Sequence, residues 1–300
     1  VAGDVMIGTD KGAPILISEI QVAGSSNTQE EFIEIYNRTP DVFDLQGWDL
    51  AIYDSGNSNW VSIVDALPAD TTLSPGGFIL FLNPSLGGSI GSVTEDVSGN
   101  ANWTDLSETS GVIALRDPAG HIVDKVGYGS VADTTLCEGG SCAQAPSAGS
   151  SLERKAFGDS TAEMMASGGV DENMGNAFDS NDNSFDFVVQ SSPNPQNSSS
   201  DPETPQAPEG EMGGPGIMHM PIFKATENQP LTVYAQMGDP MTPMSQLTTE
   251  LYYLTGDTDP SDNTLAQYSK VSGSYLGNGY WRFTTLDNVC LLYTSPSPRD

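Results

Sequence analysis

The sequence predicts an all-β protein, and three observations carry this prediction. Several short segments alternate between apolar and polar residues with a period of two, which places successive side chains on opposite faces of a strand. The 300 residues include 32 Gly and 20 Pro, a composition that favours short strands joined by many turns over long helices. Between two apolar runs, the segment 117–120 reads Asp-Pro-Ala-Gly, which is typical of the turn of a β-hairpin.

The expected strands follow from β-branched and aromatic runs that are bounded by turn residues. They lie, in chain order, at 15–22, 31–36, 48–54, 60–64, 77–82, 111–116, 121–128, 151–155 and 185–189. The segment 77–82 is apolar on both faces, which predicts an interior strand. A helical turn is expected around 161–166, inside the long irregular stretch 129–184.

The segment 31–36 shows how the two faces of a strand are distinguished. Ile33 and Ile35 share one face, whereas Phe32, Glu34 and Tyr36 share the other. A carboxylate between aromatic side chains is expected to be partly covered and to need hydrogen-bond donors. We therefore expect Glu34 to support the fold rather than to act as a functional acid.

Two pairs of motifs resemble a known family. The first pair is EFIEIYN at 31–37 with VFDLQGW at 42–48, and the second is SLERK at 151–155 with NSFDF at 183–187. Together they resemble the lamin-tail domain, an immunoglobulin-like β-sandwich found in nuclear lamins and in many bacterial secreted or surface proteins. The resemblance covers about residues 13–197. It implies a packing and interaction module, and it carries no catalytic residue over to this chain.

Composition divides the chain into segments. We expect an N-terminal extension at 1–13, the lamin-tail sandwich at 14–196, a flexible linker at 197–216, a second module at 217–289 and a non-native tail at 290–300. The linker is rich in Pro, Ser, Glu and Gly, so it cannot bury enough surface to offset its ordering entropy. The second module resembles immunoglobulin-like or fibronectin-like modules, through PLTVYA at 230–235 and LYY at 251–253. We expect it to be an incomplete immunoglobulin-like β-sandwich.

The net charge limits the choice of partner. The chain carries 40 Asp and Glu against 10 Lys and Arg, a formal charge of −30. Nucleic-acid binding needs clustered Lys and Arg that displace counterions, so no nucleic acid is expected as a partner. No apolar run reaches the roughly 20 residues of a membrane-spanning helix, so no membrane segment is expected in this fragment.

Two cysteines form a local pattern. Cys137 and Cys142 bracket Glu-Gly-Gly-Ser, a loop flexible enough to bring two sulfurs together. A zinc site needs about four Cys or His ligands, and no His lies near this pair. The remaining alternatives are a local disulfide and two free thiols, of which we expect the disulfide. It implies an oxidising, exported location, so we expect the protein to be extracellular or on the cell surface.

A nucleophile motif occurs once. The sequence Gly-Gly-Ser-Ile-Gly at 87–91 matches G-x-S-x-G around Ser89, and Asp117 and His121 follow in the order that an α/β-hydrolase uses. That motif works where a strand turns sharply into a helix, and no helical period follows Ser89. We therefore expect no catalytic residue in this chain and no enzymatic activity.

Calcium is the one cofactor that the sequence raises. Asp179, Asn181 and Asn183 place oxygen ligands at every second residue, a spacing that lets a loop wrap around a hard cation. The segment lacks the Gly and the distal Glu of an EF-hand loop, and an Asn-rich turn before a strand explains it equally. Asp257, Asp259 and Asp262 raise the same question in the second module.

Together these observations predict a non-catalytic bacterial protein fragment that acts outside the cell or on its surface. Its lamin-tail domain would bind a protein or a cell-surface ligand. The alternative is a fragment with the accessory domains of a secreted hydrolase, a nuclease or a phosphatase, whose catalytic domain lies elsewhere. An intracellular filament protein is disfavoured because the sequence has no heptad coiled coil.

Overall fold

The computed structural model describes residues 13–39, 41–203, 216–219, 230–238, 248–253, 269–277 and 280–288. The chain divides into two units, Val1–Gln206 and Ala207–Asp300, which we treat separately. Most of the regular secondary structure of the described residues is β-strand, as the sequence predicts. Within these ranges, no helix has the length and apolar character needed to cross a membrane.

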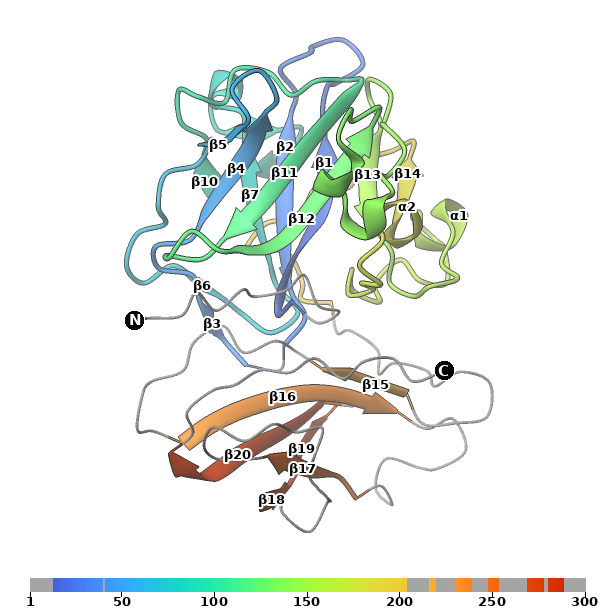
Figure 1. Ribbon diagram of the computed structural model, residues 1–300. Coiled ribbons are helices and arrows are strands. Elements are labelled where there is room, and N and C mark those ends of the chain that lie inside the picture. Colours follow the sequence, from blue (N-terminus) through green and yellow to red (C-terminus); the bar gives the residue numbers. More distant parts are fainter. Residues whose placement is uncertain are drawn as a thin grey trace. The chain divides into compact units, whose positions relative to one another are not determined.

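The first unit is a sandwich of two β-sheets (Figure 1). The larger sheet has the order β10-β7-β2-β1-β13-β14, and the smaller has the order β12-β11-β4-β5. Neighbouring strands run antiparallel except β10 and β7, which are parallel. The larger sheet contains β1 (Ile15–Gln21), β2 (Phe32–Asn37), β7 (Phe78–Leu82), β10 (Val97–Ser98), β13 (Ser151–Arg154) and β14 (Phe187–Gln190). The smaller contains β4 (Asp49–Asp54), β5 (Asn59–Ser62), β11 (Ser110–Arg116) and β12 (Ile122–Gly129).

Short elements complete the first unit. Two small antiparallel pairs join β3 (Phe43–Asp44) to β6 (Thr72–Leu73) and β8 (Ser89–Ile90) to β9 (Val93–Thr94). The helical turns are η1 (Pro84–Leu86), η2 (Thr134–Leu136), η3 (Glu138–Gly140), α1 (Ala162–Met165) and α2 (Asn183–Asp186). Thr161 starts α1, because its side chain accepts a hydrogen bond from the Met164 N–H. The helical turn expected at 161–166 is thus confirmed.

The predicted hairpin is confirmed, because β11 and β12 pair along their whole length around the turn 117–120. The expected strand at 185–189 begins two residues later than predicted. The side chain of Asp182 accepts a hydrogen bond from the Ser184 N–H and so starts the single turn of α2. That turn takes up Phe185 and Asp186, and β14 begins at Phe187.

Both faces of the larger sheet are covered. Ile33 and Ile35 of β2 face the interior of the sandwich, as the alternation predicts, and are fully buried. On the outer face, Phe32 packs with Leu80 and Leu82 under side chains of η1, β8 and β9. Tyr36, on the same face, packs against Phe78 and Ala177. The outer face is therefore a second packed layer, not a solvent-facing surface.

The boundary of the first unit differs from the expected end at residue 196. Residues 191–203, which we call the strap, follow β14 and bond to the outer face of the larger sheet. The Asn197 side chain donates to the Thr94 carbonyl, and the Ser198 N–H donates to Asp96. At the far end, the Glu203 N–H donates to the Gly76 carbonyl, and the Tyr36 hydroxyl donates to the Glu203 carbonyl. Residues 197–203 are therefore part of the sandwich rather than of a flexible linker.

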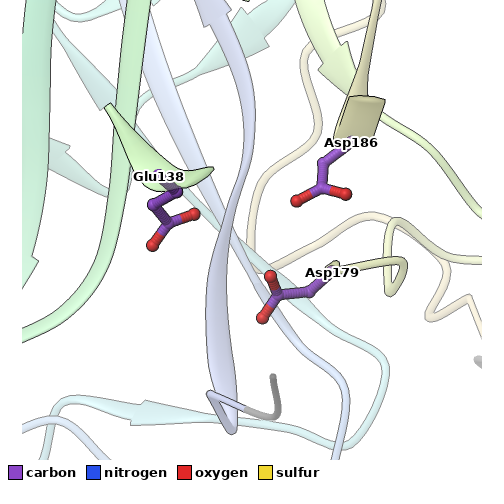
Figure 2. Close-up of side chains that lie close together, drawn as sticks. All are labelled: Glu138, Asp179 and Asp186. Carbon is purple, nitrogen blue, oxygen red and sulfur yellow. The ribbon is translucent and has the colours of Figure 1, made fainter. Parts of the chain in front are cut away.

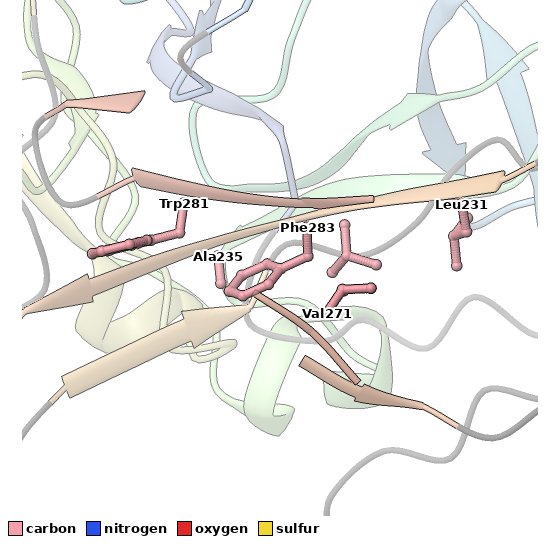
Figure 3. Packing of buried hydrophobic residues seen from close by; sticks show 6 residues of the cluster. Leu231, Ala235, Val271, Trp281 and Phe283 are labelled. Carbon is pink, nitrogen blue, oxygen red and sulfur yellow. The ribbon is translucent and has the colours of Figure 1, made fainter. Parts of the chain in front are cut away.

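The second unit contains a four-stranded antiparallel sheet with the order β15-β16-β20-β19 and a separate pair of strands, β17 and β18. Its strands are β15 (Gly216–His219), β16 (Pro230–Gly238), β17 (Glu250–Tyr253), β18 (Ser269–Ser272), β19 (Ser274–Gly277) and β20 (Tyr280–Asn288). Figure 3 shows the core between them, which includes Trp281 and Phe283 of β20 and Val271 of β18. Leu231, Val233 and Ala235 of β16 complete this cluster, and Leu251 packs against it.

Several predicted segments lie outside the described residues. They are the extension 1–12, the linker residues 204–215, the second acidic group at 257–262, and the tail 290–300 with Cys290.

Candidate functional site

The cysteine loop lies against β12. Cys137 and Cys142 are joined by a disulfide, which closes the short loop that contains η3. A Cβ atom at Gly127 of β12 would lie only 2.3 Å from the Cys137 sulfur, so only glycine allows the loop to pack this closely. The disulfide thereby holds Glu138, the first residue of η3, in a buried position beside the sheet.

Asn183, an expected calcium ligand, is instead a structural bridge. Its Oδ1 atom accepts hydrogen bonds from the N–H groups of Gly127 (2.8 Å) and Glu138 (3.0 Å). Its Nδ2 group donates to the Lys125 carbonyl and to the Glu138 carboxylate, both at 3.0 Å. Both acceptor positions of the amide oxygen are filled, so Asn183 has no oxygen to offer a cation. The amide ties α2 to β12 and η3.

Asp179, the first expected calcium ligand, belongs to a different group of side chains. Figure 2 shows the side chains of Glu138, Asp179 and Asp186, which come from η3, from the loop before α2 and from α2. Their carboxylates lie within 4.8 Å of one another. Asn181, the remaining expected ligand, donates its backbone N–H to the Asp179 carboxylate. Because the Asn183 oxygen already accepts two hydrogen bonds, Asn183 does not complete the expected ligand set, and calcium binding at Asp179 and Asn181 stays a prediction.

Arg154 is the cation of this acidic group. Its guanidinium is fully buried, 2.9 Å from Asp124, 3.8 Å from Asp179 and 3.9 Å from Asp186. It also donates to the backbone carbonyl of Ile17 and lies over the ring of Phe187, 4.5 Å from the ring centre. An ion-pair network with a fixed arginine explains the convergence of carboxylates without a metal ion.

Burial dominates the protonation of this network. Burial raises the pKa of Asp186 to about 6, although Arg154 opposes this shift. The pKa of Glu138 is raised well above its usual range by burial and by the charges of Asp124 and Asp179. Burial alone would lower the pKa of Arg154, but the surrounding carboxylates raise it, so the guanidinium stays charged. The network connects the two sheets, because Asp124 lies on β12 and Arg154 on β13.

A second group of acids, two of them buried and one partly exposed, lies on the outer face of the larger sheet. Glu19 of β1 is directly opposite Glu34 of β2 on one side and Glu153 of β13 on the other. Cross-strand partners share one face of a sheet, so the three side chains form a row across three neighbouring strands. We call these three residues the carboxylate row. Glu19 is 3% exposed and Glu34 is 1% exposed, and no ion pair of the described residues involves any of the three.

Neutral donors, two of them from the strap, satisfy the carboxylate row. The Gln196 N–H donates to Glu34 at 2.6 Å, and the Asn194 N–H donates to Glu19 at 3.4 Å. The hydroxyl of Ser18 donates to Glu34, and that of Ser151 donates to Glu19. On Glu153, the Asn176 side chain donates at 3.3 Å. One sequence signal points to this group, the alternation that covers Glu34, and none points to the strap donors.

The protonation of the carboxylate row is shifted strongly. Burial, with the neighbouring charge of Glu153, raises the pKa of Glu19 to about 8. Burial likewise raises the pKa of Glu153 to about 7. The pKa of Glu34 is raised well above its usual range, first by burial and then by the charge of Glu19. Three acids of this kind side by side favour the protonated, neutral form.

A groove of about 440 Å³ lies at one end of this face. The strap forms one wall with Pro193, Asn194 and Pro195, and Ile90 and Val93 of β8 and β9 also line it. Gln21, Ser25 and Glu30 supply most of its polar side chains. The described lining includes no Lys or Arg, so the groove suits neutral or basic groups.

Ser89 and His121 occupy different local settings. Ser89 opens β8 and is exposed, in a strand that turns back into β9 and not into a helix. His121 lies in the turn between β11 and β12, with Nδ1 3.0 Å from Asp117 Oδ2. The strand-to-helix setting that the G-x-S-x-G motif requires is therefore not what surrounds Ser89.

Comparison with known proteins identifies part of the first unit. Residues 9–130 match the family model of the Lamin Tail Domain. No curated protein matches the chain. Among solved structures, the chain is similar to a DUF4876 family protein from Bacteroides thetaiotaomicron VPI-5482, with 13% sequence identity, a TM-score of 0.40, and coverage of 60% of this chain and 72% of that one.

Proposed function

We propose, taking the lamin tail domain at residues 9–130 as the premise, that this chain is a non-catalytic binding module of a bacterial protein that acts outside the cell or on its surface. The disulfide between Cys137 and Cys142 supports an exported location, because disulfides persist in oxidising compartments. The ionisable side chains of the first unit support a packing role, since Asp124, Asp179 and Asp186 surround Arg154 in the interior.

The groove is where we expect a partner protein to bind, and it is the observation that carries this proposal. It combines the apolar side chains of Ile90 and Val93 with the carboxylate of Glu30. A chain of net charge −30 attracts basic partners and repels polyanions, so the partner is a basic protein segment and not a nucleic acid. Apolar contacts would hold such a segment, and Glu30 would select its charge.

A random peptide library displayed on phage tests this proposal with the purified chain as bait. We expect the enriched peptides to contain Lys or Arg next to apolar residues. Their affinity should fall at least about tenfold for Glu30→Lys, which reverses the charge of the groove. It should fall similarly for Ser92→Trp, which fills the groove.

Glu108→Lys is the matched control, because Glu108 is exposed and does not line the groove. It should leave the affinity of the enriched peptides unchanged. Enriched peptides that bind both groove variants as tightly as the wild type would refute the groove as the binding site. A library that yields no enriched peptide would count against the binding function itself.

We further propose that the second unit is an immunoglobulin-like spacer or adhesion module. The sheet of β15, β16, β20 and β19 and the pair of β17 and β18 support this proposal, because they enclose one apolar core. Phe283→Ala should then lower the free energy of unfolding of this unit by about 3 kcal/mol or more. The unfolding transition of the first unit should stay unchanged. A calorimetric scan in which Phe283→Ala lowered the unfolding temperature of both units together would contradict this proposal.

A further inference from the structure

We propose that the strap is a pH-operated latch, which lies closed over the carboxylate row when the row is protonated and is released when the row ionises. The latch concerns residues 191–203 and Glu19, Glu34 and Glu153. It does not depend on the partner proposed for the groove.

The geometry of the strap carries this inference. Its backbone N–H groups at Asn194 and Gln196 bond to Glu19 and Glu34, so the strap is the element that separates these carboxylates from water. On the opposite side the carboxylates rest on β1 and β2, and at Glu19 and Glu34 each of these strands pairs with a neighbour on both sides. Water can therefore reach the row most easily by displacement of the strap, since moving a strand would break a ladder of hydrogen bonds.

The charges around the row are all of one sign. Glu19, Glu34 and Glu153 face one another from β1, β2 and β13. The negative charge of Glu203 in the strap raises the pKa of Glu153, and the charge of Glu172 raises the pKa of Glu203. No Lys or Arg of the described chain forms an ion pair with the row, and Arg154 points to the interior, toward Asp124. Ionisation therefore adds like charges to a buried space with no compensating cation.

The protonation of the row places the transition near neutral pH. The pKa values of Glu153 and Glu19 are raised to about 7 and about 8, and burial is the largest cause of both shifts; at Glu19 burial outweighs the hydrogen bond from the Asn194 N–H, which by itself favours the ionised form. With a released strap these acids would meet water and return toward their usual values near 4.5. The closed state thus binds more protons than the open state, so its extra stability is fully present below about pH 4.5 and is lost progressively as the pH rises to about 8.

Release of the strap would have two consequences. It would remove the wall that Pro193, Asn194 and Pro195 give to the groove. It would also lengthen the chain segment that leads to the second unit, by about 40 Å if the thirteen residues extend fully. One protonation event would thus alter both a binding surface and the reach of the second unit.

Amide hydrogen exchange on the whole chain tests the latch. Protection factors of strap peptides, corrected for the intrinsic pH dependence of exchange, are compared between pH 6 and pH 9. We expect protection at Asn194 and Gln196 to fall about tenfold or more at pH 9. Peptides of β11, which exchange through global unfolding of the same unit, serve as the internal reference and should stay far more protected than the strap at pH 9. Unchanged strap protection, or strap and β11 peptides with the same protection at pH 9, would overturn the latch.

Variants separate the carboxylate row from other effects of pH. Glu19→Gln combined with Glu153→Gln should keep the strap protected at pH 9, because two of the three charges cannot form. The single variant Glu153→Gln, at a partly exposed position, should retain several-fold more protection than the wild type at pH 9 and serves if the double variant does not fold. Glu108→Gln, an exposed control, should behave like the wild type. Loss of strap protection in the Gln variants equal to that of the wild type would refute the proposal.

Discussion

Arg154 is the residue with the largest electrostatic role in the first unit. It is fully buried and bonds at once to the carboxylate of Asp124 and to the backbone carbonyls of Ile17 and Phe178. A single guanidinium can do this because its five N–H donors lie in a rigid plane. Its removal would leave buried carboxylates without a cation, which costs more than the loss of an exposed pair.

We therefore expect Arg154→Met to lower the free energy of unfolding by about 3–5 kcal/mol at pH 7, as measured by urea titration. Arg116→Met is the control, because the pair of Arg116 and Asp49 is 17–18% exposed. It should cost about 1 kcal/mol or less. Equal losses of unfolding free energy in the two variants would show that burial does not increase the cost of removing Arg154.

Asn183 allows a direct choice between a calcium ligand and a structural bridge. Asn183→Asp replaces the two N–H donors of the amide with an oxygen that faces the Glu138 carboxylate. We expect a loss of about 3 kcal/mol, and no recovery in millimolar calcium chloride. Asn181→Asp, the same chemical change two residues earlier, should stay within about 0.5 kcal/mol of the wild type. Thermal unfolding with and without calcium measures both, and rescue of Asn183→Asp by calcium would contradict the bridge.

Among the elements, η3 depends on its covalent closure. The disulfide closes a loop in which the two cysteines are five positions apart. We expect the double variant Cys137→Ser/Cys142→Ser to lose about 2 kcal/mol, the chain-entropy value for so short a loop. A reductant should lower the melting temperature of the wild type to that of the variant and leave the variant unchanged. A reductant effect of equal size on the variant would point to another cause.

The elements also show what the sequence can predict. The hairpin of β11 and β12 and the two faces of β2 follow from alternation and turn chemistry, which are local properties of the chain. The positions of Cys137 and Cys142 likewise indicate a loop that can close. The strap was not predictable, because its donor Gln196 meets Glu34 across 162 positions of sequence. Its Pro- and Ser-rich composition indicates a linker, and only tertiary contact reveals the buried acids that it covers.

The same reasoning explains the candidate sites. The spacing of oxygen-bearing side chains at 179–183 indicates a cation-binding loop. Spacing alone does not show whether those oxygens already accept hydrogen bonds from other parts of the chain. The N–H groups that donate to the Asn183 side-chain oxygen belong to Gly127 and Glu138, which lie 56 and 45 positions away in the sequence. Arg154 supplies the positive charge among the carboxylates, and a local motif at 179–183 likewise does not predict its position there.

At the scale of the whole molecule, buried acids should make stability depend on pH in an unusual direction. Burial raises the pKa values of Glu31 to about 7 and of Glu19 to about 8, above the value near 4.5 expected in the unfolded chain. The stabilisation is therefore fully present below about pH 4.5 and is lost as the pH rises to about 8.

We accordingly expect the free energy of unfolding of the first unit to be higher at pH 5.5 than at pH 8, by several kcal/mol, in urea titrations at fixed ionic strength. A repeat in 1 M salt separates this effect from general repulsion, because salt screens exposed charges far more than buried ones. A flat or rising dependence on pH would contradict the raised pKa values.

One feature of the larger sheet affects where this protein can be divided. The family match ends at residue 130, yet β13 and β14 come later in the chain and β13 pairs with β1. A polypeptide cut at residue 130 would leave one side of β1 as an open edge, with backbone N–H and C=O groups that lack partners. Such an edge accepts a strand from another molecule. The shortened protein should therefore self-associate into dimers or aggregates, whereas in the chain that retains β13 and β14 this side of β1 is already paired.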